Sequence, residues 1–265
     1  MSDKPIKSVR RNNATQILRY TNLFRYIRNW WLHFALKFGA YKGGEAKFDG
    51  RNGVNYRVPV EMYHLFKEII LDDCYLRGLP KFESKDITVL DIGANIGLFS
   101  LFMVSRFPAA KIYAYEPMPP NYEYLTESVK RIGATGIISE NKAVNNVTGK
   151  QMLHYHLKRP YPTAASLVHS NGATKVVEVD CVRLEDIIEN CELEKVDLLK
   201  LDCEGSEFGI IYETPTFYFD RISRIALEYH ESRAARSNGQ DLESYLQSLG
   251  YHTAVGGKTM MWAWK

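Results

Sequence analysis

Hydrophobic and polar positions change their period along the chain, and the sharpest change lies at residues 87–100. An apolar run rich in β-branched residues ends at Asp91, the chain breaks at Gly93, and apolar residues resume at helical spacing around Gly97. This order predicts a strand, a glycine turn and a helix. The two glycines allow the backbone to approach a ligand where a Cβ would collide. Asp91, at the carboxyl end of the strand, lies where open α/β sheets bind their ligands.

Other segments repeat this alternation before and after the glycine turn. The patterns predict strands at 54–60, 111–116, 137–144, 196–202 and 222–229, and helices at 61–77, 121–131, 183–189, 242–249 and from residue 206 onward. Because short connections join alternating strands and helices, we expect a parallel, doubly wound sheet.

Two regions depart from this parallel order. Residues 151–157 and 174–181 alternate like an antiparallel insertion, with a polar loop at 158–173 between them. Residues 251–264 form two strand-like stretches on either side of a Gly-Gly turn, which predicts an antiparallel hairpin. The expected fold class is therefore α/β, a Rossmann-like sheet of seven strands that finishes in an antiparallel hairpin.

The N-terminal stretch has its own pattern and charge. Between residues 14 and 38 apolar side chains recur at steps of three and four, which predicts one amphipathic helix with its basic residues off the apolar stripe. Residues 1–42 hold nine of the 34 basic residues and one of the 31 acidic residues, so the remainder is mildly acidic. We expect a basic helical arm over residues 1–45 and one α/β domain over residues 46–265. The helix, with paired tryptophans, can lie on a membrane surface, pack on its own domain or contact a partner subunit.

Composition favours a globular protein of the cytoplasm. The 265 residues, 45% hydrophobic and 25% charged, suffice for a full core. Four scattered cysteines without C-x-x-C spacing indicate reduced thiols. We see neither a signal peptide nor an apolar run of about 18 residues, so we expect a cytoplasmic location, with peripheral membrane contact as the alternative. The acidic body argues against a nucleic-acid partner.

Acidic and polar residues follow one predicted strand after another, and in a parallel sheet these strand ends meet at one edge. They are Asp91, Glu116, Asp202 with Glu204, and Glu228 with His230. Glu116 follows Gly93 at the distance where an acid after the second strand binds the hydroxyls of a nucleotide ribose. An acid beside the glycine turn suits a cationic ligand better than a pyrophosphate, and the G-x-G-x-x-G spacing of dinucleotide sites is absent.

Several motifs resemble those of the FkbM family of S-adenosylmethionine-dependent methyltransferases, over roughly residues 88–231. They are D-I-G-A-N-I-G at 91–97, Y-E-P at 115–117 with Asn121 after it, N-K-A-V at 141–144, A-S-L at 165–167, and L-K-L-D-C-E-G-S-E at 199–207. The resemblance implies a class I methyltransferase fold, whose sheet also ends in a reversed hairpin. It implies methyl transfer to a hydroxyl oxygen of a natural product or glycan.

The same resemblance implies roles for individual residues. Those expected to bind S-adenosyl-L-methionine are Asp91, Gly93, Asn95 and Gly97 at its methionine part, Glu116 at its ribose, Ala143 at its adenine, and Asn121 and Asp202. Asp202 and Glu204 are expected to face the methyl-transfer zone, with His230 at the opposite wall.

The chemistry of these side chains leaves the base open. His230 is the candidate general base because an imidazole titrates near neutral pH, and Asp202 is the alternative base or a carboxylate that orients the substrate. Asp202, Glu204 and His230 can also bind a divalent cation, although we favour no metal. Side chains of the insertion that can contact substrate are His154, Tyr155, His156, Tyr161, Ser166 and His169.

The leading hypothesis is an S-adenosylmethionine-dependent O-methyltransferase that acts on a glycan, a glycolipid or a secondary metabolite. Two alternatives belong to other classes. A nicotinamide-dependent oxidoreductase would share the doubly wound sheet. A membrane-peripheral binding protein with an inactive methyltransferase core would make use of the basic arm.

Overall fold

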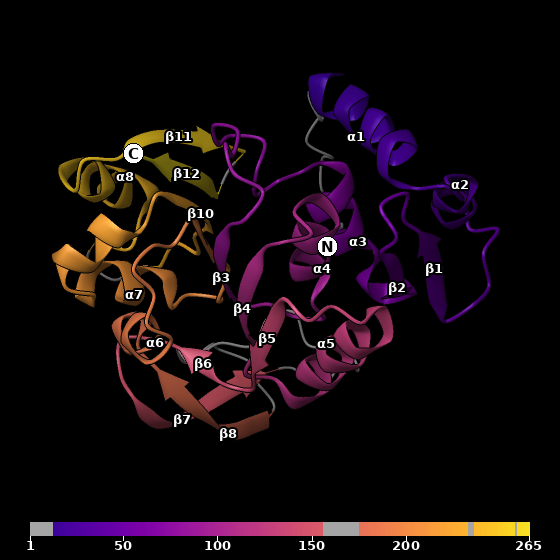
Figure 1. Cartoon of the computed structure of the whole chain (residues 1–265). Coiled ribbons are helices and arrows are strands. Elements are labelled where there is room, and N and C mark those ends of the chain that lie inside the picture. Colours follow the sequence, from indigo (N-terminus) through magenta and orange to yellow (C-terminus); the bar gives the residue numbers. More distant parts are fainter. Residues whose placement is uncertain (1–12, 156–174, 233–235, 258) are drawn as a thin grey trace, which may run out of the picture.

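The computed structural model describes residues 13–155, 175–232, 236–257 and 259–265. Its centre is a sheet of seven strands in the order β11-β12-β10-β9-β3-β4-β5 (Figure 1). Their bounds are β3 Thr88–Ile92, β4 Lys111–Tyr115, β5 Ile137–Glu140, β9 Leu198–Leu201, β10 Arg224–Glu228, β11 His252–Gly256 and β12 Met260–Trp264. Strands β10, β9, β3, β4 and β5 pair in parallel, whereas β12 pairs antiparallel with both β10 and β11. The predicted seven-stranded α/β fold with a C-terminal hairpin is confirmed.

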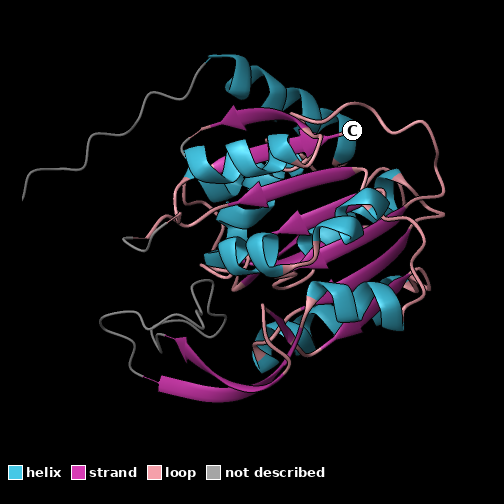
Figure 2. Cartoon of the chain, turned by 90° about the vertical axis from the view of Figure 1, so that its left-hand side faces the viewer, coloured by secondary structure: helices cyan, strands magenta, loops and turns pink. Residues whose placement is uncertain are grey.

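Helices pack on both faces of this sheet, as the helices beside the strands in Figure 2 illustrate. The α-helices of the described residues, including the N-terminal α1 and α2, are α1 Asn13–Tyr26, α2 Trp31–Lys37, α3 Tyr63–Phe66, α4 Leu98–Arg106, α5 Pro119–Ile132, α6 Leu184–Asn190, α7 Glu207–Glu213 and α8 Gly239–Ser248. Successive strand residues contribute to opposite layers, because side chains alternate across a strand. Val89, for example, belongs to the hydrophobic cluster that contains residues of α4 and α5, while Leu90 belongs to the cluster that contains residues of α6, α7 and α8. Both layers are apolar, as parallel strands require.

Two smaller sheets flank the centre. Strands β1 (Glu45–Asp49) and β2 (Asn55–Pro59) form an antiparallel hairpin beside α2 (Figure 1). Strands β7 (Gly149–Tyr155) and β8 (Lys175–Val182) form the predicted antiparallel insertion. The strand predicted at 137–144 is divided, because its last residues form β6 (Ala143–Val144), which leaves the main sheet and pairs with β8.

The N-terminal helix is not continuous, which corrects the single helix predicted at 14–38. The chain leaves α1 at Ile27, which forms an isolated bridge with Gly50 at the end of β1. The amide of Arg28 donates to the carbonyl of Asp49, and the Asn29 side chain contacts the backbone of Lys47 and Asp49. These tertiary hydrogen bonds replace the helical ones, so the helix resumes only as α2.

The helix predicted at 61–77 is also shorter and irregular. It consists of a 3₁₀ turn, η1 (Val60–Met62), then α3, then a π-helical turn, η2 (Lys67–Leu71). A second 3₁₀ helix, η3 (Thr216–Arg221), precedes β10. Among the described residues, no helix is both long and apolar enough to cross a membrane.

The arm is bound to the rest of the chain by specific contacts. Arg19 forms an ion pair and hydrogen bonds with Asp72, and the Asn22 amide donates to the carbonyl of Leu71. His33 is buried and its Nδ1 forms a short hydrogen bond with the Tyr63 hydroxyl. The division of the chain at residue 45 remains a prediction, although side chains from both sides of it share one hydrophobic cluster.

A buried ion pair crosses the middle of the sheet. Asp91 of β3 and Lys200 of β9 are register partners, and their Oδ1 and Nζ atoms lie 3.1 Å apart. Asp91 also accepts a 2.6 Å hydrogen bond from the Ser100 hydroxyl of α4. Lys200 donates to the carbonyls of Ile92 at 3.1 Å and Gly93 at 2.7 Å. The pair thereby ties β3, β9 and the first turn after β3 together.

We predict that acid destabilises the protein through His33. Burial, with Arg19 and further cations nearby, lowers the pKa of His33 to about 4. The unfolded chain therefore binds a proton below about pH 6.5 that the folded chain does not bind until about pH 4, so stability is lost as pH falls. This difference amounts to about 2 kcal/mol between pH 7 and pH 5. Urea unfolding at pH 7 and pH 5 should show that the unfolding free energy of His33→Asn falls by about 2 kcal/mol less than that of wild type. An identical fall in the two proteins would contradict the prediction.

We further predict that Lys200→Met costs about 3–5 kcal/mol of unfolding free energy, because it leaves the Asp91 carboxylate buried without its cation. The matched control is Lys150→Met, since Lys150 forms an ion pair with Glu178 in which both side chains are exposed. That substitution should cost less than about 1 kcal/mol. Equal losses in the two variants, measured by urea unfolding, would show that the buried pair has no special part in stability.

Candidate active site

A pocket lies at the carboxyl ends of β3, β4 and β9 and encloses about 580 Å³, the open solvent at its mouth included. Six of the residues predicted to bind cofactor line it, namely Gly93, Asn95, Glu116, Asn121, Ala143 and Asp202, and Glu204 lines it as well. The structure therefore brings most of the predicted residues together at one edge of the sheet.

Asp91 and Gly97, also predicted around the cofactor, do not line this pocket. Asp91 is fully buried on the α4 side of the sheet, where Ser100 and Lys200 hold its carboxylate. Gly97 has a φ of +83° and directly precedes α4, with Leu125 packed against it. In the described structure, both residues support the turn at Gly93 from the side away from the pocket.

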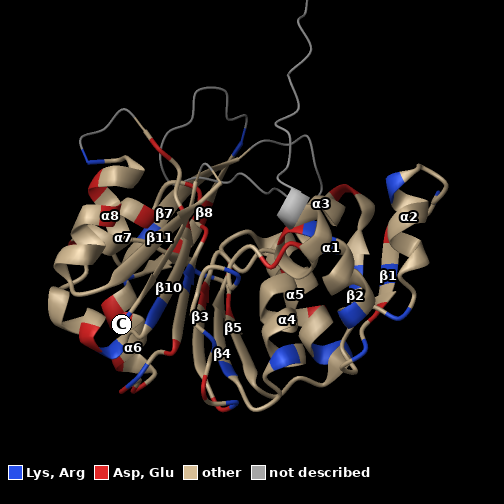
Figure 3. Cartoon of the chain, turned by 90° about the horizontal axis from the view of Figure 1, so that it is seen from above, with Lys and Arg blue, Asp and Glu red and all other residues tan. Residues whose placement is uncertain are grey.

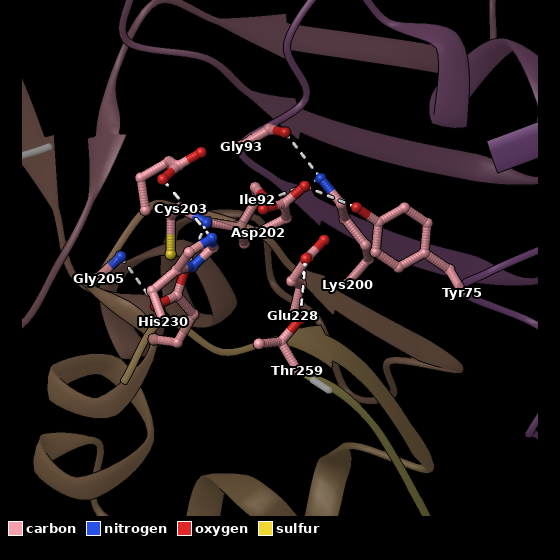
Figure 4. A network of polar contacts seen from close by, with 12 residues as sticks. Tyr75, Ile92, Gly93, Lys200, Asp202, Cys203, Gly205, Glu228, His230 and Thr259 are labelled. Atoms are coloured by element: carbon pink, nitrogen blue, oxygen red, sulfur yellow. Dashed lines mark hydrogen bonds and ion pairs between the residues drawn. The ribbon is translucent and has the colours of Figure 1, made fainter. Parts of the chain in front are cut away.

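Lys200 is a contributor to the site that the sequence analysis missed. Its ammonium contacts the carbonyls of Ile92 and Gly93 (Figure 4), so the turn is held from beneath by a cation. Burial disfavours the charged lysine, but Asp91 and Asp202 more than compensate, and its pKa is raised. A lysine inside the otherwise apolar strand L-L-K-L was the available signal.

The backbone around the pocket adopts conformations that few residues tolerate. Gly93 has a φ of +75°, and a Cβ there would collide with the carbonyl oxygen of Asp202. Asn95 and Glu204 are left-handed without being glycine, with φ of +52° and +53°. Such strained positions concentrate at functional sites, where the surrounding structure over-determines them. The direction of the Glu204 and Asn95 side chains therefore depends on a left-handed backbone conformation that costs free energy.

Glu116 follows β4, and its carboxylate is directed at two amides. It accepts from the amide of Asn95 at 2.8 Å and from that of Met118 at 2.9 Å. Burial raises its pKa to about 7, although both hydrogen bonds and Lys200 oppose this. The acid predicted at the ribose position is therefore fixed in orientation and lies in a pocket wall.

His230 is held by Glu207, a residue for which the sequence analysis assigned no role. The Glu207 carboxylate is fully buried at the start of α7 and accepts from the amides of Cys203 at 2.8 Å and Gly205 at 2.9 Å. It also lies 3.1 Å from Nδ1 of His230. Burial alone would lower the pKa of His230, but this hydrogen bond and charge raise it to about 9. The imidazole is therefore protonated on both ring nitrogens, and positively charged, at neutral pH.

Two further carboxylates face this cation. Glu204 has Oε2 3.5 Å from Nε2 of His230, and burial raises the pKa of Glu204 to about 7 despite the nearby imidazolium. Asp202 accepts a 2.6 Å hydrogen bond from the Tyr75 hydroxyl (Figure 4). Glu204 therefore titrates close to neutral pH, whereas His230 does not.

The acidic cluster is better suited to its internal contacts than to a metal ion. Within the described residues, Asp202, Glu207 and His230 offer ligand atoms within 4.8 Å of one another, with Glu207 in place of the predicted Glu204. The Glu207 carboxylate already accepts from two amides and from His230. A cation would have to displace these hydrogen bonds and the proton of the imidazole, so we assign no metal here.

The insertion beside the pocket is described in part. Leu153 of β7 lines the pocket, and the next residues, His154 and Tyr155, are half-buried at the end of that strand. The other side chains expected to contact substrate lie outside the described residues; they are His156, Tyr161, Ser166 and His169.

Comparison with known proteins identifies relatives of this chain. Three are methyltransferases: sdnD of Sordaria araneosa is 28% identical over 222 residues, which cover 72% of this chain and 83% of that protein. The 31-O-demethyl-FK506 methyltransferase FkbM of Streptomyces tacrolimicus is 26% identical over 201 residues, 64% and 75% of the two chains. The hexuronic acid methyltransferase AglP of Haloferax volcanii is 23% identical over 205 residues, 77% and 80% of the two.

A solved structure shares the fold. The methyltransferase FkbM from Methylobacillus flagellatus matches with a TM-score of 0.51 at 15% identity. The match covers 95% of this chain and 59% of that one, so this chain spans less than two thirds of that protein. Residues 91–253 match the methyltransferase FkbM domain, which is more than half of the chain and includes the glycine turn, the acids at the strand ends and His230. The chain therefore belongs to the FkbM family of methyltransferases.

Proposed function

We propose that this protein is an S-adenosyl-L-methionine-dependent O-methyltransferase that acts on a hydroxyl of a glycan, a glycolipid or a secondary metabolite. The observation that carries the proposal is the pocket at the strand ends, where Glu116, Asp202 and Glu204 surround the turn at Gly93. Family membership supports methyl transfer. The names of two relatives, one for a 31-O-demethyl substrate and one for hexuronic acid, support an oxygen acceptor on a metabolite or a sugar.

The residues of the pocket fit this cofactor by their chemistry. S-Adenosylmethionine supplies a methyl group on a positively charged sulfonium, and carboxylates suit a positive ligand. Glu116 is placed to accept from ribose hydroxyls, because its orientation is fixed by the amides of Asn95 and Met118. The apolar side chains of Met118 and Ala143 offer a surface for a flat base. A nicotinamide-dependent oxidoreductase is not favoured, since the family is one of methyltransferases.

The catalytic groups that we propose are Glu204 and His230, with the base role given to Glu204 and not to His230 as first hypothesised. Methyl transfer is an in-line displacement, so the protein's main contribution is to position the acceptor. A base whose pKa lies near the working pH is the most effective at removing the hydroxyl proton, and Glu204 meets this condition. His230, which is hydrogen-bonded to Glu207, stays in its charged imidazolium form. It stabilises the negative charge that develops on the acceptor oxygen as that oxygen loses its proton. Asp202 accepts a hydrogen bond from Tyr75, which fixes its carboxylate, and its proposed part is to orient the substrate.

We predict that Glu116→Gln weakens binding of S-adenosylhomocysteine about 10- to 100-fold, because a charged acceptor of hydroxyl hydrogen bonds is lost. Isothermal titration calorimetry provides the measurement. Glu140→Gln is the matched control, since Glu140 ends the next strand, β5, and pairs at the surface with Lys142. Its affinity should equal that of wild type. An unchanged affinity in Glu116→Gln would remove Glu116 from the ribose site.

We also predict a bell-shaped dependence of kcat on pH. The rate should rise as Glu204 loses its proton near pH 7 and fall as His230 loses its own near pH 9. Because the two groups lie close together, the two apparent values belong to the pair. Glu204→Gln should lower kcat about 10²–10⁴-fold and abolish the rising limb, while affinity for S-adenosylhomocysteine stays near that of wild type.

The acceptor for this assay can be found with methyl-labelled cofactor and cell extracts, with products read by mass spectrometry. The outcome against the assignment is a Glu204→Gln enzyme that keeps its rate and its rising limb. In that case Asp202→Asn is the next variant to measure, because Asp202 lies in the same wall. Failure to transfer methyl to any acceptor, together with no binding of S-adenosylhomocysteine, would contradict the proposed function itself.

A further inference from the structure

The outer face of the two arm helices carries a set of large apolar side chains that are exposed or half-exposed. We call these residues of α1 and α2, with those that directly flank α2, the arm surface: Ile17, Tyr20, Phe24, Trp30, Trp31, Phe34 and Phe38. Phe38 is 74% exposed, Trp31 58% and Phe24 47%. Single exposed apolar residues are ordinary, but a contiguous group on a protein surface marks an interaction site.

Ring contacts join five of these side chains, all except Ile17 and Trp31. The Trp30 ring lies 5.4 Å from that of Phe24 and 6.1 Å from that of Phe34. Phe34 in turn stacks with Tyr20 at 5.9 Å and with Phe38 at 6.5 Å. The rings therefore form a row that runs from α1 across the turn onto α2.

The exposed rings of this row do not serve to attach the arm to its own domain. That attachment uses Leu23, Tyr26, Ile27 and Leu32, which are buried in the main hydrophobic cluster, and the half-buried Tyr20 and Phe34, which pack against the same cluster. The spacing of apolar residues predicts one stripe along a single helix, but the chain breaks after α1, and Trp31 and Phe38 are exposed. The arm is thus apolar on both faces, which its own folding does not require.

The charged residues of the arm itself have one sign. Residues 13–44 include no aspartate or glutamate. In the part of the chain that the structure describes, Arg19 is the one of their five basic residues that forms an ion pair with a buried acid, Asp72. Arg25, Arg28, Lys37 and Lys42 are exposed. Lys37 lies over the rings of Tyr20 and Phe38 at 5.7 and 5.5 Å. In Figure 3 lysine and arginine segments also recur along α2, β1 and β2.

This combination selects among the classes of partner. A second copy of the chain would bring the same basic residues together across a twofold axis, because an isologous interface pairs a surface with itself. Tryptophan and phenylalanine between lysine and arginine are the composition of helices that lie in the headgroup region of an anionic bilayer. We propose that the arm surface docks on the surface of an anionic lipid membrane, with α1 and α2 in the plane of the interface. This proposal does not depend on the proposed methyl transfer.

The test is co-sedimentation of the full chain with vesicles of phosphatidylcholine, with and without phosphatidylserine. Wild type should bind the vesicles that contain phosphatidylserine, and added salt should weaken the binding, because the attraction to anionic lipid is screened. The double variant Trp31→Ala/Phe38→Ala should bind at least about tenfold more weakly, because its apolar contact area is lost. Arg28→Gln/Lys37→Gln should lose about fivefold for each charge removed.

The matched control is Phe217→Ala, because Phe217 is as exposed as Trp31, at 58%, but lies in η3. Its vesicle binding should equal that of wild type, and all variants should keep the melting temperature and S-adenosylhomocysteine affinity of wild type. The proposal is overturned if wild type does not sediment with anionic vesicles, or if the arm variants sediment as wild type does. It is also overturned if sedimentation velocity shows a dimer that Trp31→Ala/Phe38→Ala dissociates.

Discussion

The ion pair between Asp91 and Lys200 is the interaction on which the rest of the site depends. It joins neighbouring strands at one register position, in a layer that is otherwise apolar. Since an unpaired charge in such a place is very costly, each residue constrains the other. The lysine donates its remaining hydrogen bonds to the carbonyls of Ile92 and Gly93. Sheet register and the shape of the glycine turn are therefore set by the same cation.

The protonation states of the site are set by the surroundings of each group. The hydrogen bond that His230 donates to the Glu207 carboxylate keeps the imidazole charged, with a pKa of about 9. Burial raises the pKa of both Glu204 and Glu116 to about 7. The three glutamates share one side-chain chemistry, yet their environments give them different parts in the site. Groups whose environments move their pKa values apart are the usual basis for a division between acid and base.

Much of this arrangement was predictable from local sequence, because parallel strands present their carboxyl ends at one edge. That rule alone placed Glu116, Asp202 and Glu204 beside the glycine turn. The part that could not be predicted depends on contacts between distant residues. The break after Ile27 comes from its bridge to Gly50, and the outward turn of Trp31 follows from it. Glu207 contacts His230 because the backbone reverses at Glu204 and Gly205, which periodicity does not reveal.

One contact extends the reach of the N-terminal helices into the pocket wall. Helix α1 is attached to Leu71 and Asp72, and Tyr75, which follows shortly after, donates its hydroxyl to Asp202. Trp262 of the C-terminal hairpin also donates to the carbonyls of Cys74 and Tyr75. The N-terminal helices and the C-terminal hairpin therefore both support Tyr75, the residue that contacts the Asp202 carboxylate in the candidate site. Trimming either end to obtain a smaller catalytic fragment would leave that carboxylate without its anchor.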